Sequence, residues 1–146
     1  MEMVRIYEIP DCKMVSSGIG MFGEEKFESF PKWFSSLQAT IFPRDFLFED
    51  KGGLHWVILY EPSINVPNEF EIIDFKGGLY AVSCDIDQKT DIEAMKKIKK
   101  DFLDTLGYEF DNSRPEMGHI IGTSSVQTAL KYEQMDYWTP IKQKST

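Results

Sequence analysis

The sequence contains few of the residues that build a chemical site by themselves. Its two cysteines, Cys12 and Cys84, lie far apart and form no C-x-x-C pair, so they indicate buried, inert thiols and no disulfide scaffold. Its two histidines, His55 and His119, are also far apart, whereas a zinc site needs three or four ligands and usually includes a close pair. We therefore expect no metal ion and no other cofactor.

Phosphate-binding and nucleophile motifs are also missing. No stretch matches G-x-G-x-x-G, G-x-x-x-x-G-K-[ST] or G-x-S-x-G. The 24 acidic residues outnumber the 16 basic ones, giving a net charge of −8, and an acidic surface opposes binding to a phosphate backbone. The N-terminus has no basic and apolar signal pattern, and no run approaches the ~18 apolar residues of a membrane span. We expect a cytoplasmic protein that binds neither a membrane nor nucleic acid directly.

Aromatic residues are abundant by contrast. The 146 residues fit a single domain, and they include 11 Phe, 6 Tyr and 3 Trp. Large rings with a polar edge line the pockets that bind lipophilic molecules, but they also fill ordinary cores. Composition alone leaves both interpretations open.

The spacing of apolar residues predicts an α+β domain. Strands and helices alternate in a way that suggests two similar halves, which would form one antiparallel sheet with both helices on one face. A disordered tail is expected over 143–146. The expected elements are strands at 4–9 and 14–21, a helix at 24–38, a strand at 54–60, a hairpin of strands 70–75 and 79–85 turning at Lys76-Gly77-Gly78, a helix ending before Gly107, and strands at 118–121 and 131–141.

The second helix has the clearest boundaries. Thr90 and Glu93 match a capping box, and Gly107 is a typical left-handed stop. The lysine-rich run 96–100 is expected on the solvated face, opposite an apolar stripe. The residues of this stripe are Ile92, Met95, Ile98, Phe102 and Leu106. The tetrapeptide Lys-Gly-Gly-Leu occurs at 51–54 and 76–79, and both copies are interpreted as turns that enter a strand.

Alternation along the last strand places an acid between two rings. Tyr132, Asp136 and Trp138 share one face of that strand, and Trp56 and Tyr60 share a face of an earlier strand. A carboxylate between aromatic rings can orient a cationic ligand or position a water molecule. The alternative is that Asp136 faces solvent and the rings only pack on the sheet.

Several short motifs, taken in order, resemble one family. They are Leu79-Tyr80-Ala81-Val82 after Gly77-Gly78, then Gly107-Tyr108-Glu109, then Asn112-Ser113-Arg114-Pro115, and finally Trp138-Thr139-Pro140-Ile141-Lys142. Together they resemble the GyrI-like family, the effector-binding domain of AraC-type and MerR-type regulators. The resemblance spans nearly the whole chain. It implies a duplicated βαββ (SHS2-like) fold with a ligand cleft between the halves. It also implies binding of lipophilic, often cationic, compounds by a stand-alone domain that lacks a DNA-binding segment.

The resemblance has one departure. Family members commonly carry a glutamate where this chain has Gly118, so Glu116 or Asp136 would have to supply the acid. Some relatives are hydrolases that use a pocket carboxylate and water, which makes Asp136 and Glu116 the candidate catalytic residues here. The predicted ligand-binding set is Trp33, Trp56, Tyr60, Glu116, Gly118, Tyr132, Asp136 and Trp138.

Three functions follow from these patterns. The first is binding of a small lipophilic effector or drug, in transcription regulation or in toxin sequestration. The second is hydrolysis of a strained or electrophilic small molecule by a carboxylate and water. The third is an adaptor that binds another protein, and a homodimer also stays open.

Overall fold

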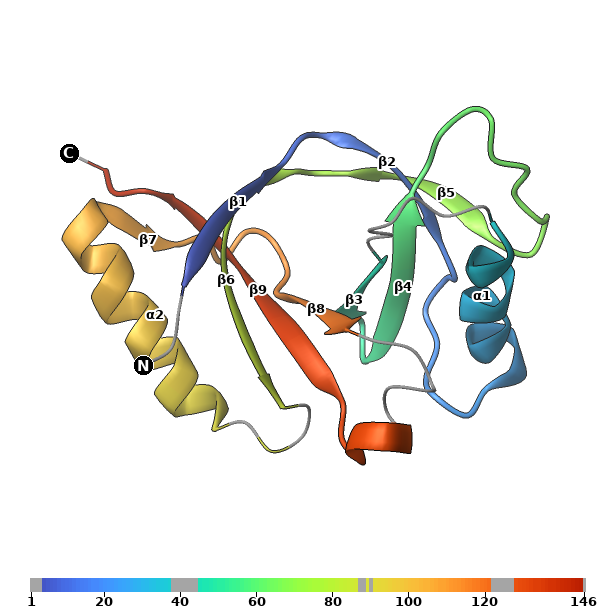
Figure 1. Cartoon of the computed structure of the whole chain (residues 1–146). Helices are drawn as coiled ribbons and strands as arrows, with labels where there is room; N and C mark the ends of the chain where they lie inside the picture. The colour runs from blue at the N-terminus through green and yellow to red at the C-terminus, as the bar shows by residue number, and fades with distance from the viewer. Residues whose placement is uncertain (1–3, 38–44, 87–88, 90, 122–127, 146) are drawn as a thin grey trace. The chain divides into compact units, whose positions relative to one another are not determined.

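The chain divides into two compact units. The computed structural model describes residues 4–37, 45–86, 89, 91–121 and 128–145. Unit 1 is formed by Met1–Pro10 and Gly77–Thr146, and unit 2 by Asp11–Lys76. Figure 1 labels the elements of both units. No helix within the described ranges is long and apolar enough to cross a bilayer.

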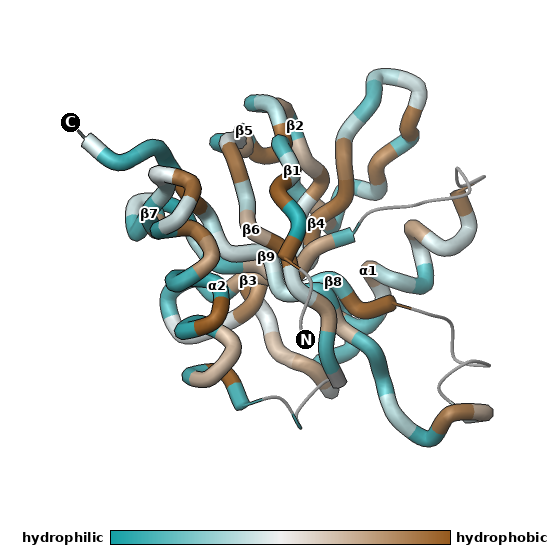
Figure 2. Tube along the Cα trace, turned by 60° about the vertical axis from the view of Figure 1, so that its left-hand side comes forward, coloured by the Kyte–Doolittle hydropathy of each residue, from teal (hydrophilic) through white to brown (hydrophobic). Residues whose placement is uncertain are grey.

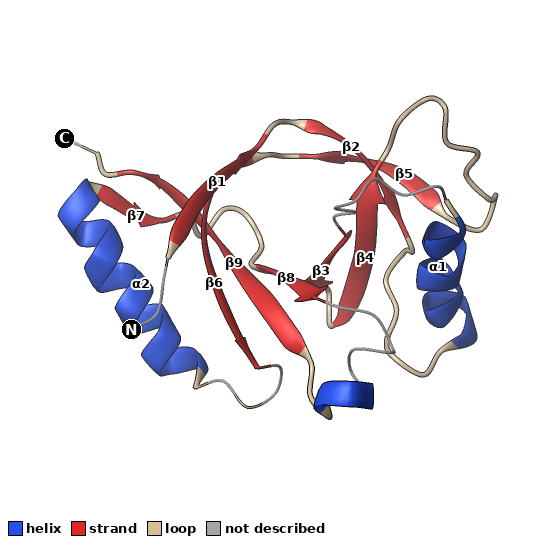
Figure 3. Cartoon of the chain, viewed as in Figure 1, coloured by secondary structure: helices blue, strands red, loops and turns tan. Residues whose placement is uncertain are grey.

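Unit 2 is a four-stranded antiparallel sheet with one helix. Its elements are β2 (Cys12–Ser16), α1 (Glu25–Ser36), β3 (Asp45–Asp50), β4 (Gly53–Leu59) and β5 (Glu71–Phe75). The strands pair in the order β3-β4-β2-β5. Helix α1 lies against β4, and its buried residues Phe27 and Phe30 face the sheet (Figure 3).

Unit 1 repeats this plan. Its elements are β1 (Arg5–Ile9), β6 (Gly78–Ile86), α2 (Ile92–Leu106), β7 (Tyr108–Phe110), β8 (Met117–Ile121) and β9 (Gln134–Gln143). The strands pair in the order β1-β6-β9-β8, and the short β7 also pairs with β9. Helix α2 covers the face that carries Ala81 and Ile141, which form a buried cluster with Leu103.

The two units share one topology. In unit 2, the segment β2-α1-β3-β4 places its last strand between the other two, and in unit 1 the segment β6-α2-β8-β9 does the same. Each sheet gains a fourth strand from elsewhere in the chain, β5 in unit 2 and β1 in unit 1. The prediction of an α+β chain built from a duplicated antiparallel βαββ plan is therefore confirmed.

The predicted hairpin lies at the wrong Lys-Gly-Gly copy. Strands β5 and β6 follow one another directly, but β5 pairs with β2 and β6 pairs with β1. A side chain at Gly77 would collide with the backbone of Ile9 and Pro10, so this glycine is needed for close passage of two chain segments. The real hairpin joins β3 to β4 through Lys51 and Gly52, whose φ angles of 49° and 80° match a type I′ turn.

Helix α2 buries a different stripe from the predicted one. Met95, Lys99 and Leu103 are buried, whereas Ile98 and Phe102 are 42% and 39% exposed. The Lys99 ammonium donates hydrogen bonds to the Tyr137 carbonyl at 2.8 Å and to Thr139 Oγ1 at 3.0 Å. These partners make the burial of a lysine tolerable, because a buried charge needs hydrogen bonds to replace water.

The predicted stripe is also wrong at its two ends. Ile92 and Leu106 are also exposed, and Figure 2 shows apolar and polar segments alternating along α2. Thr90 lies outside the described residues. The cap that is seen is Asp91, whose carboxylate accepts the Ala94 N–H at 3.1 Å. Gly107 ends the helix with φ 79°, as expected.

Several strand boundaries differ from the predictions. Strand β3 was expected to be a loop, and β7 was not expected at all. Strand β2 ends at Ser16 and not at 21, although Gly20 still forms one bridge to Leu54. The last strand begins at Gln134, so Tyr132 precedes it in a bend.

The ends of α1 and the C-terminal end of the chain also differ from the predictions. Helix α1 ends at Ser36, before the predicted end at 38. Helix α1 continues through Pro31, which lies inside it. Strand β9 includes Gln143, and the Lys144 ammonium pairs with Asp104 at 2.9 Å. Gln143 therefore belongs to the last strand, and Lys144 contacts α2, while the disordered tail stays a prediction.

The Lys51-Gly52 turn gives a direct test of the β3–β4 hairpin. A Cβ at Gly52 would meet no atom within 4 Å, so Gly52→Ala changes only the backbone preference. We expect Gly52→Ala to lower the free energy of unfolding by about 1 kcal/mol, because alanine disfavours positive φ. Lys51→Asn should leave stability unchanged or raise it, since asparagine tolerates this conformation. Urea unfolding of both variants measures the effect, and equal stability of Gly52→Ala and wild type would contradict the turn assignment.

Candidate functional site

The site is built on the face of the unit 1 sheet that points away from α2. Strand β9 alternates sides: Thr139 and Ile141 point towards α2, so Asp136 and Trp138 point to the opposite face. We call this second side the Asp136 face. The residues on it include Arg5, Tyr7, Tyr80, Cys84, His119, Asp136 and Trp138.

Asp136 lies in the middle of a row of three reactive side chains. Its Cα pairs with Cys84 on β6 at one side and with His119 on β8 at the other. Side chains paired in this way have Cβ atoms roughly 4.5–5.5 Å apart. Cys84 is exposed, and Asp136 and His119 are partly buried. A ligand on this face would therefore meet a thiol, a carboxylate and an imidazole side by side.

An aromatic floor adjoins this row. The Trp138 ring stacks on Tyr7, with centroids 5.3 Å apart and planes at 27°, and it meets Tyr80 edge-on at 5.7 Å. Trp138 and Tyr80 are buried, and Tyr7 is partly exposed. Sequence reasoning identified Trp138 but missed Tyr7, because only the β1–β6–β9 pairing brings the first strand next to the last.

Arg114 supports the floor from the edge of the sheet. Its guanidinium lies 4.8 Å from the centre of the Tyr80 ring and donates to the Leu79 and Ile141 carbonyls at 2.9 Å each. Its Nε donates to Asp111 at 2.9 Å. Hydrogen bonds from Ser113, and then from Arg114, lower the pKa of Asp111 to about 2. This pair keeps its charges at any neutral pH and fixes Tyr80 beneath Trp138.

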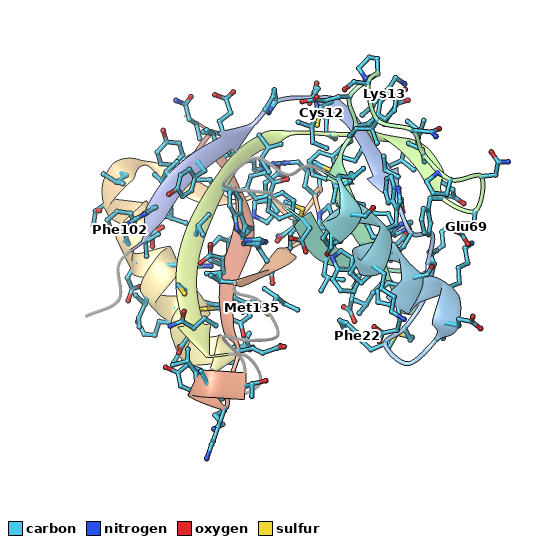
Figure 4. The ribbon with its side chains drawn as sticks, turned by 45° about the vertical axis from the view of Figure 1, so that its right-hand side comes forward. Cys12, Lys13, Phe22, Glu69, Phe102 and Met135 are labelled. Atoms are coloured by element: carbon cyan, nitrogen blue, oxygen red, sulfur yellow. The ribbon has the colours of Figure 1, made fainter. Side chains whose placement is uncertain are left out.

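The two predicted acids lie on opposite faces. Glu116 is directed towards α2, where its carboxylate is 3.3 Å from the Lys96 ammonium. Gly118 pairs with Tyr137 and so belongs to the α2 side as well. A side chain at Gly118 would meet the end of the Met135 side chain, which occupies that space and is labelled in Figure 4. Of the two acids, only Asp136 lies beside the aromatic floor.

The predicted residues of unit 2 form a separate aromatic cluster. Trp56 packs against Phe27 and Phe34 of α1, with ring centroids 5.5 and 5.9 Å apart, and its indole donates to Asp45 at 2.8 Å. Trp33 packs on Phe70 at 5.3 Å in the same cluster.

Tyr60 lies beyond the end of β4, outside this cluster. Its backbone N–H bonds to the Lys13 carbonyl at 3.0 Å. The structure thus brings Trp33 and Trp56 together beneath α1 and leaves Tyr60 apart. Their role in ligand binding stays a prediction.

Unit 2 also contains a serine–histidine–aspartate chain that sequence spacing did not reveal. Ser16 Oγ lies 2.7 Å from His55 Nδ1, and His55 Nε2 lies 3.0 Å from Asp50. Ser16 has no exposed surface, and its Oγ also accepts the Gly18 N–H at 3.0 Å. A nucleophile closed to solvent cannot reach a substrate. The hydrogen bonds between Ser16, His55 and Asp50 instead connect β2, β4 and the β3–β4 hairpin.

One open hollow of about 460 Å³ lies at the edge of unit 2. Four of its six lining residues are charged, and they form two ion pairs: Lys13 with Asp74 at 2.8 Å, and Lys76 with Asp11 at 3.6 Å. Cys12 and Lys13 in this region are labelled in Figure 4. Because its surface is open and its charges are paired, the hollow is a poor site for a lipophilic molecule. Within the described residues, no group of three His, Cys, Asp or Glu side chains could hold a metal ion.

Comparisons with known proteins identify the fold. No family model matches the chain, and no curated protein sequence does. Among solved structures, the EcmrR C-terminal domain matches with a TM-score of 0.64 and 12% identity, covering 98% of this chain and 99% of that one. A hydrolase from Listeria innocua matches with a TM-score of 0.65 and 9% identity, covering 95% and 91%. These likenesses show the fold, which is consistent with the GyrI-like architecture expected from the sequence motifs.

A third match places this fold inside a longer protein. EcmrR in a complex with DNA matches with a TM-score of 0.65 and 11% identity over 99% of this chain. The present chain covers 58% of that protein, so it spans a little over half of its length.

The Cys84–Asp136 pair can be tested by thiol chemistry. Partial removal of the thiol from water, and then the charge of Asp136 and a hydrogen bond to it, raise the pKa of Cys84 to about 11. Asp136→Asn removes the charge, so we expect the pKa of Cys84 to fall, though burial should keep it above its usual value. The pH dependence of iodoacetamide alkylation, read for each cysteine by mass spectrometry, measures this shift.

Cys12 serves as the internal control for this experiment. Its pKa is raised by burial and then by Asp11, so Asp136→Asn should leave it unchanged. An unshifted alkylation midpoint at Cys84 in the variant would show that the two side chains do not interact.

Proposed function

We propose that the chain binds a small lipophilic molecule on the Asp136 face of unit 1. One observation carries this proposal. The partly exposed carboxylate of Asp136 lies two residues before the buried Trp138, on the same face of β9, and the Tyr7 ring stacks on Trp138. The flat body of a ligand would lie against the rings, and a polar group would meet Asp136. A few placed polar groups on an aromatic surface are typical of sites for small molecules.

Both parts of this surface contribute to affinity. Burying apolar ligand area against the rings is worth roughly 25 cal/mol per Å². A cation held over an aromatic face gains about 0.5–2 kcal/mol, and a neighbouring carboxylate fixes its orientation. Cys84 stays protonated at neutral pH because its pKa is about 11, so it can donate a weak hydrogen bond and adds no second negative charge.

The biological role that fits best is that of an effector-binding domain. The chain shares its fold with the C-terminal domain of EcmrR, a protein whose structure was solved in a complex with DNA. A domain of this kind would sense a lipophilic compound for a transcription regulator or sequester it. The small molecule is the partner we propose, without direct contact between this domain and nucleic acid.

Ligand binding is testable with three matched variants. Lipophilic dyes and drugs, cationic and neutral, should raise the melting temperature of the wild type, because a ligand that binds only the native state stabilises it. Tyr7→Leu should reduce the shift for every ligand that binds, and Asp136→Asn should reduce it for charged or hydrogen-bonding ligands. Glu116→Gln removes an acid from the opposite face and should change nothing.

Differential scanning fluorimetry followed by titration calorimetry provides the measurement. If no compound of a broad panel shifts the melting temperature, the proposal fails. If Glu116→Gln weakens binding as much as Asp136→Asn does, the site lies on the other face.

A hydrolase is the second candidate, and the Cys84–Asp136–His119 row favours it. Asp136 could take a proton from a water molecule whose oxygen bonds to an electrophilic carbon. The bond between that carbon and its leaving oxygen then breaks, and the protonated Asp136 returns the proton to the leaving oxygen. We expect turnover of an activated ester or epoxide to be lost in Asp136→Asn and retained in Glu116→Gln, measured as kcat/KM by product release. Equal rates in Asp136→Asn and wild type would reject the hydrolase and leave the binding proposal intact.

A further inference from the structure

We propose that Arg5 sets the charge preference of the Asp136 face, so that the site favours neutral lipophilic molecules over singly charged cations. This inference rests on the proposed binding function, and it concerns which ligands the site accepts. Arg5 belongs to the first strand of unit 1, and neither the aromatic spacing nor the acid in the last strand points to it.

The strand register places Arg5 on the same face as the aromatic floor. Its Cα pairs with Val82 on β6, and Val82 pairs in turn with Trp138 on β9. Partners across a sheet point to the same side, so Arg5 and Trp138 stand in one row. The next row of the sheet contains Asp136.

The contacts of the guanidinium agree with this placement. Arg5 Nη1 donates a hydrogen bond to the Tyr7 hydroxyl at 3.3 Å, and the Tyr7 ring stacks on Trp138. The pKa of Arg5 is raised mainly by this bond to Tyr7, and the negative charge of Asp136 adds the smallest contribution in the same direction. Arg5 is exposed, so its guanidinium meets the Tyr7 hydroxyl at the solvent boundary.

Arg5 is the cation that can offset the negative charge of Asp136, because Arg114 and Lys96 are paired with other acids. Arg114 is already paired with Asp111 at 2.9 Å, and Lys96 with Glu116 is on the α2 side. In the described rows that contain Trp138 and Asp136, Arg5 is the one guanidinium and Asp136 is the one carboxylate. Their charges cancel, so the face that adjoins the aromatic floor has little net charge.

A cationic ligand must therefore compete with a cation that the protein supplies itself. To reach Asp136 it has to displace the guanidinium or remain close to it, whereas a neutral ligand of the same shape meets no such repulsion. For exposed charges at this range the effect should be roughly threefold to tenfold in affinity. It should also shrink at high salt, because salt screens interactions between exposed charges.

Two planar fluorescent dyes of nearly equal size provide the test. They are the cation 10-methylacridinium and its neutral counterpart 9-methylacridine, titrated at a pH of about 8, where the second dye is uncharged. Arg5→Met removes the charge and keeps an apolar stem, and Arg5→Lys keeps the charge as a matched control. Arg5 is exposed, so both variants should fold, and circular dichroism with thermal unfolding checks that they do.

The expected result is a change for one dye only. Arg5→Met should bind 10-methylacridinium roughly threefold to tenfold more tightly than the wild type, and this gain should fade in about 0.5 M salt. Its affinity for 9-methylacridine should stay within about twofold, and Arg5→Lys should behave like the wild type.

Other results overturn the inference in distinguishable ways. If Arg5→Met binds the cation no better than the wild type, or less well, Arg5 does not oppose cations and this inference fails alone. If no variant binds either dye, the proposed function fails and the inference fails with it.

Discussion

The position of β9 at the centre of its sheet is the constraint on which unit 1 depends. It pairs with β6 on one side and with β8 on the other, and its last residues also pair with β7. Because side chains alternate along a strand, β9 supplies two different surfaces. Thr139 and Ile141 anchor α2, and Asp136 and Trp138 form the opposite face. The helix contact therefore fixes where the acid and the indole point.

The two surfaces are held by different kinds of interaction. On the α2 side, a buried ammonium on Lys99 ties the helix to the strand through Thr139 and a main-chain carbonyl. On the opposite side, Arg114 bonds to two main-chain carbonyls and lies over the Tyr80 ring. Both cations act mainly on the backbone. The floor is thus buried at Tyr80 and Trp138, while Asp136 and Arg5 retain access to solvent.

Local signals predicted much of this fold, and pairing between distant segments decided the rest. Alternation placed Asp136 and Trp138 on one face, and Gly107 marked a helix end, because both depend on neighbouring residues only. The two Lys-Gly-Gly sequences are locally identical, yet only the first forms a hairpin, since the second strand of the other copy pairs with β1. Tyr7 and Arg5 belong to the candidate site through that same pairing, so no local pattern could reveal them.

The stripe of α2 was misassigned for a related reason. Ile98, Phe102 and Leu106 have the apolar spacing of a core face, and lysine is rarely buried, so the pattern favoured the wrong side of the helix. The acceptors that make Lys99 tolerable come from β9, about 40 residues further along the chain, as its bond to Thr139 shows. A pattern read within one helix contains no information about such partners. Sequence periodicity fails here at Lys99, a polar residue whose burial depends on acceptors far away in the sequence.

The glycine at 118 shows how the position of an acid determines its chemistry. A carboxylate there would point to the α2 side, into space that Met135 fills and near the pair formed by Glu116 and Lys96. Asp136 is one strand away but faces the other side, near Trp138 and in the row of the sheet beside that of Arg5. Asp136 therefore does not replace an acid missing from position 118. It belongs to a different surface, which it shares with Arg5 of β1 and with the rings of Trp138 and Tyr7.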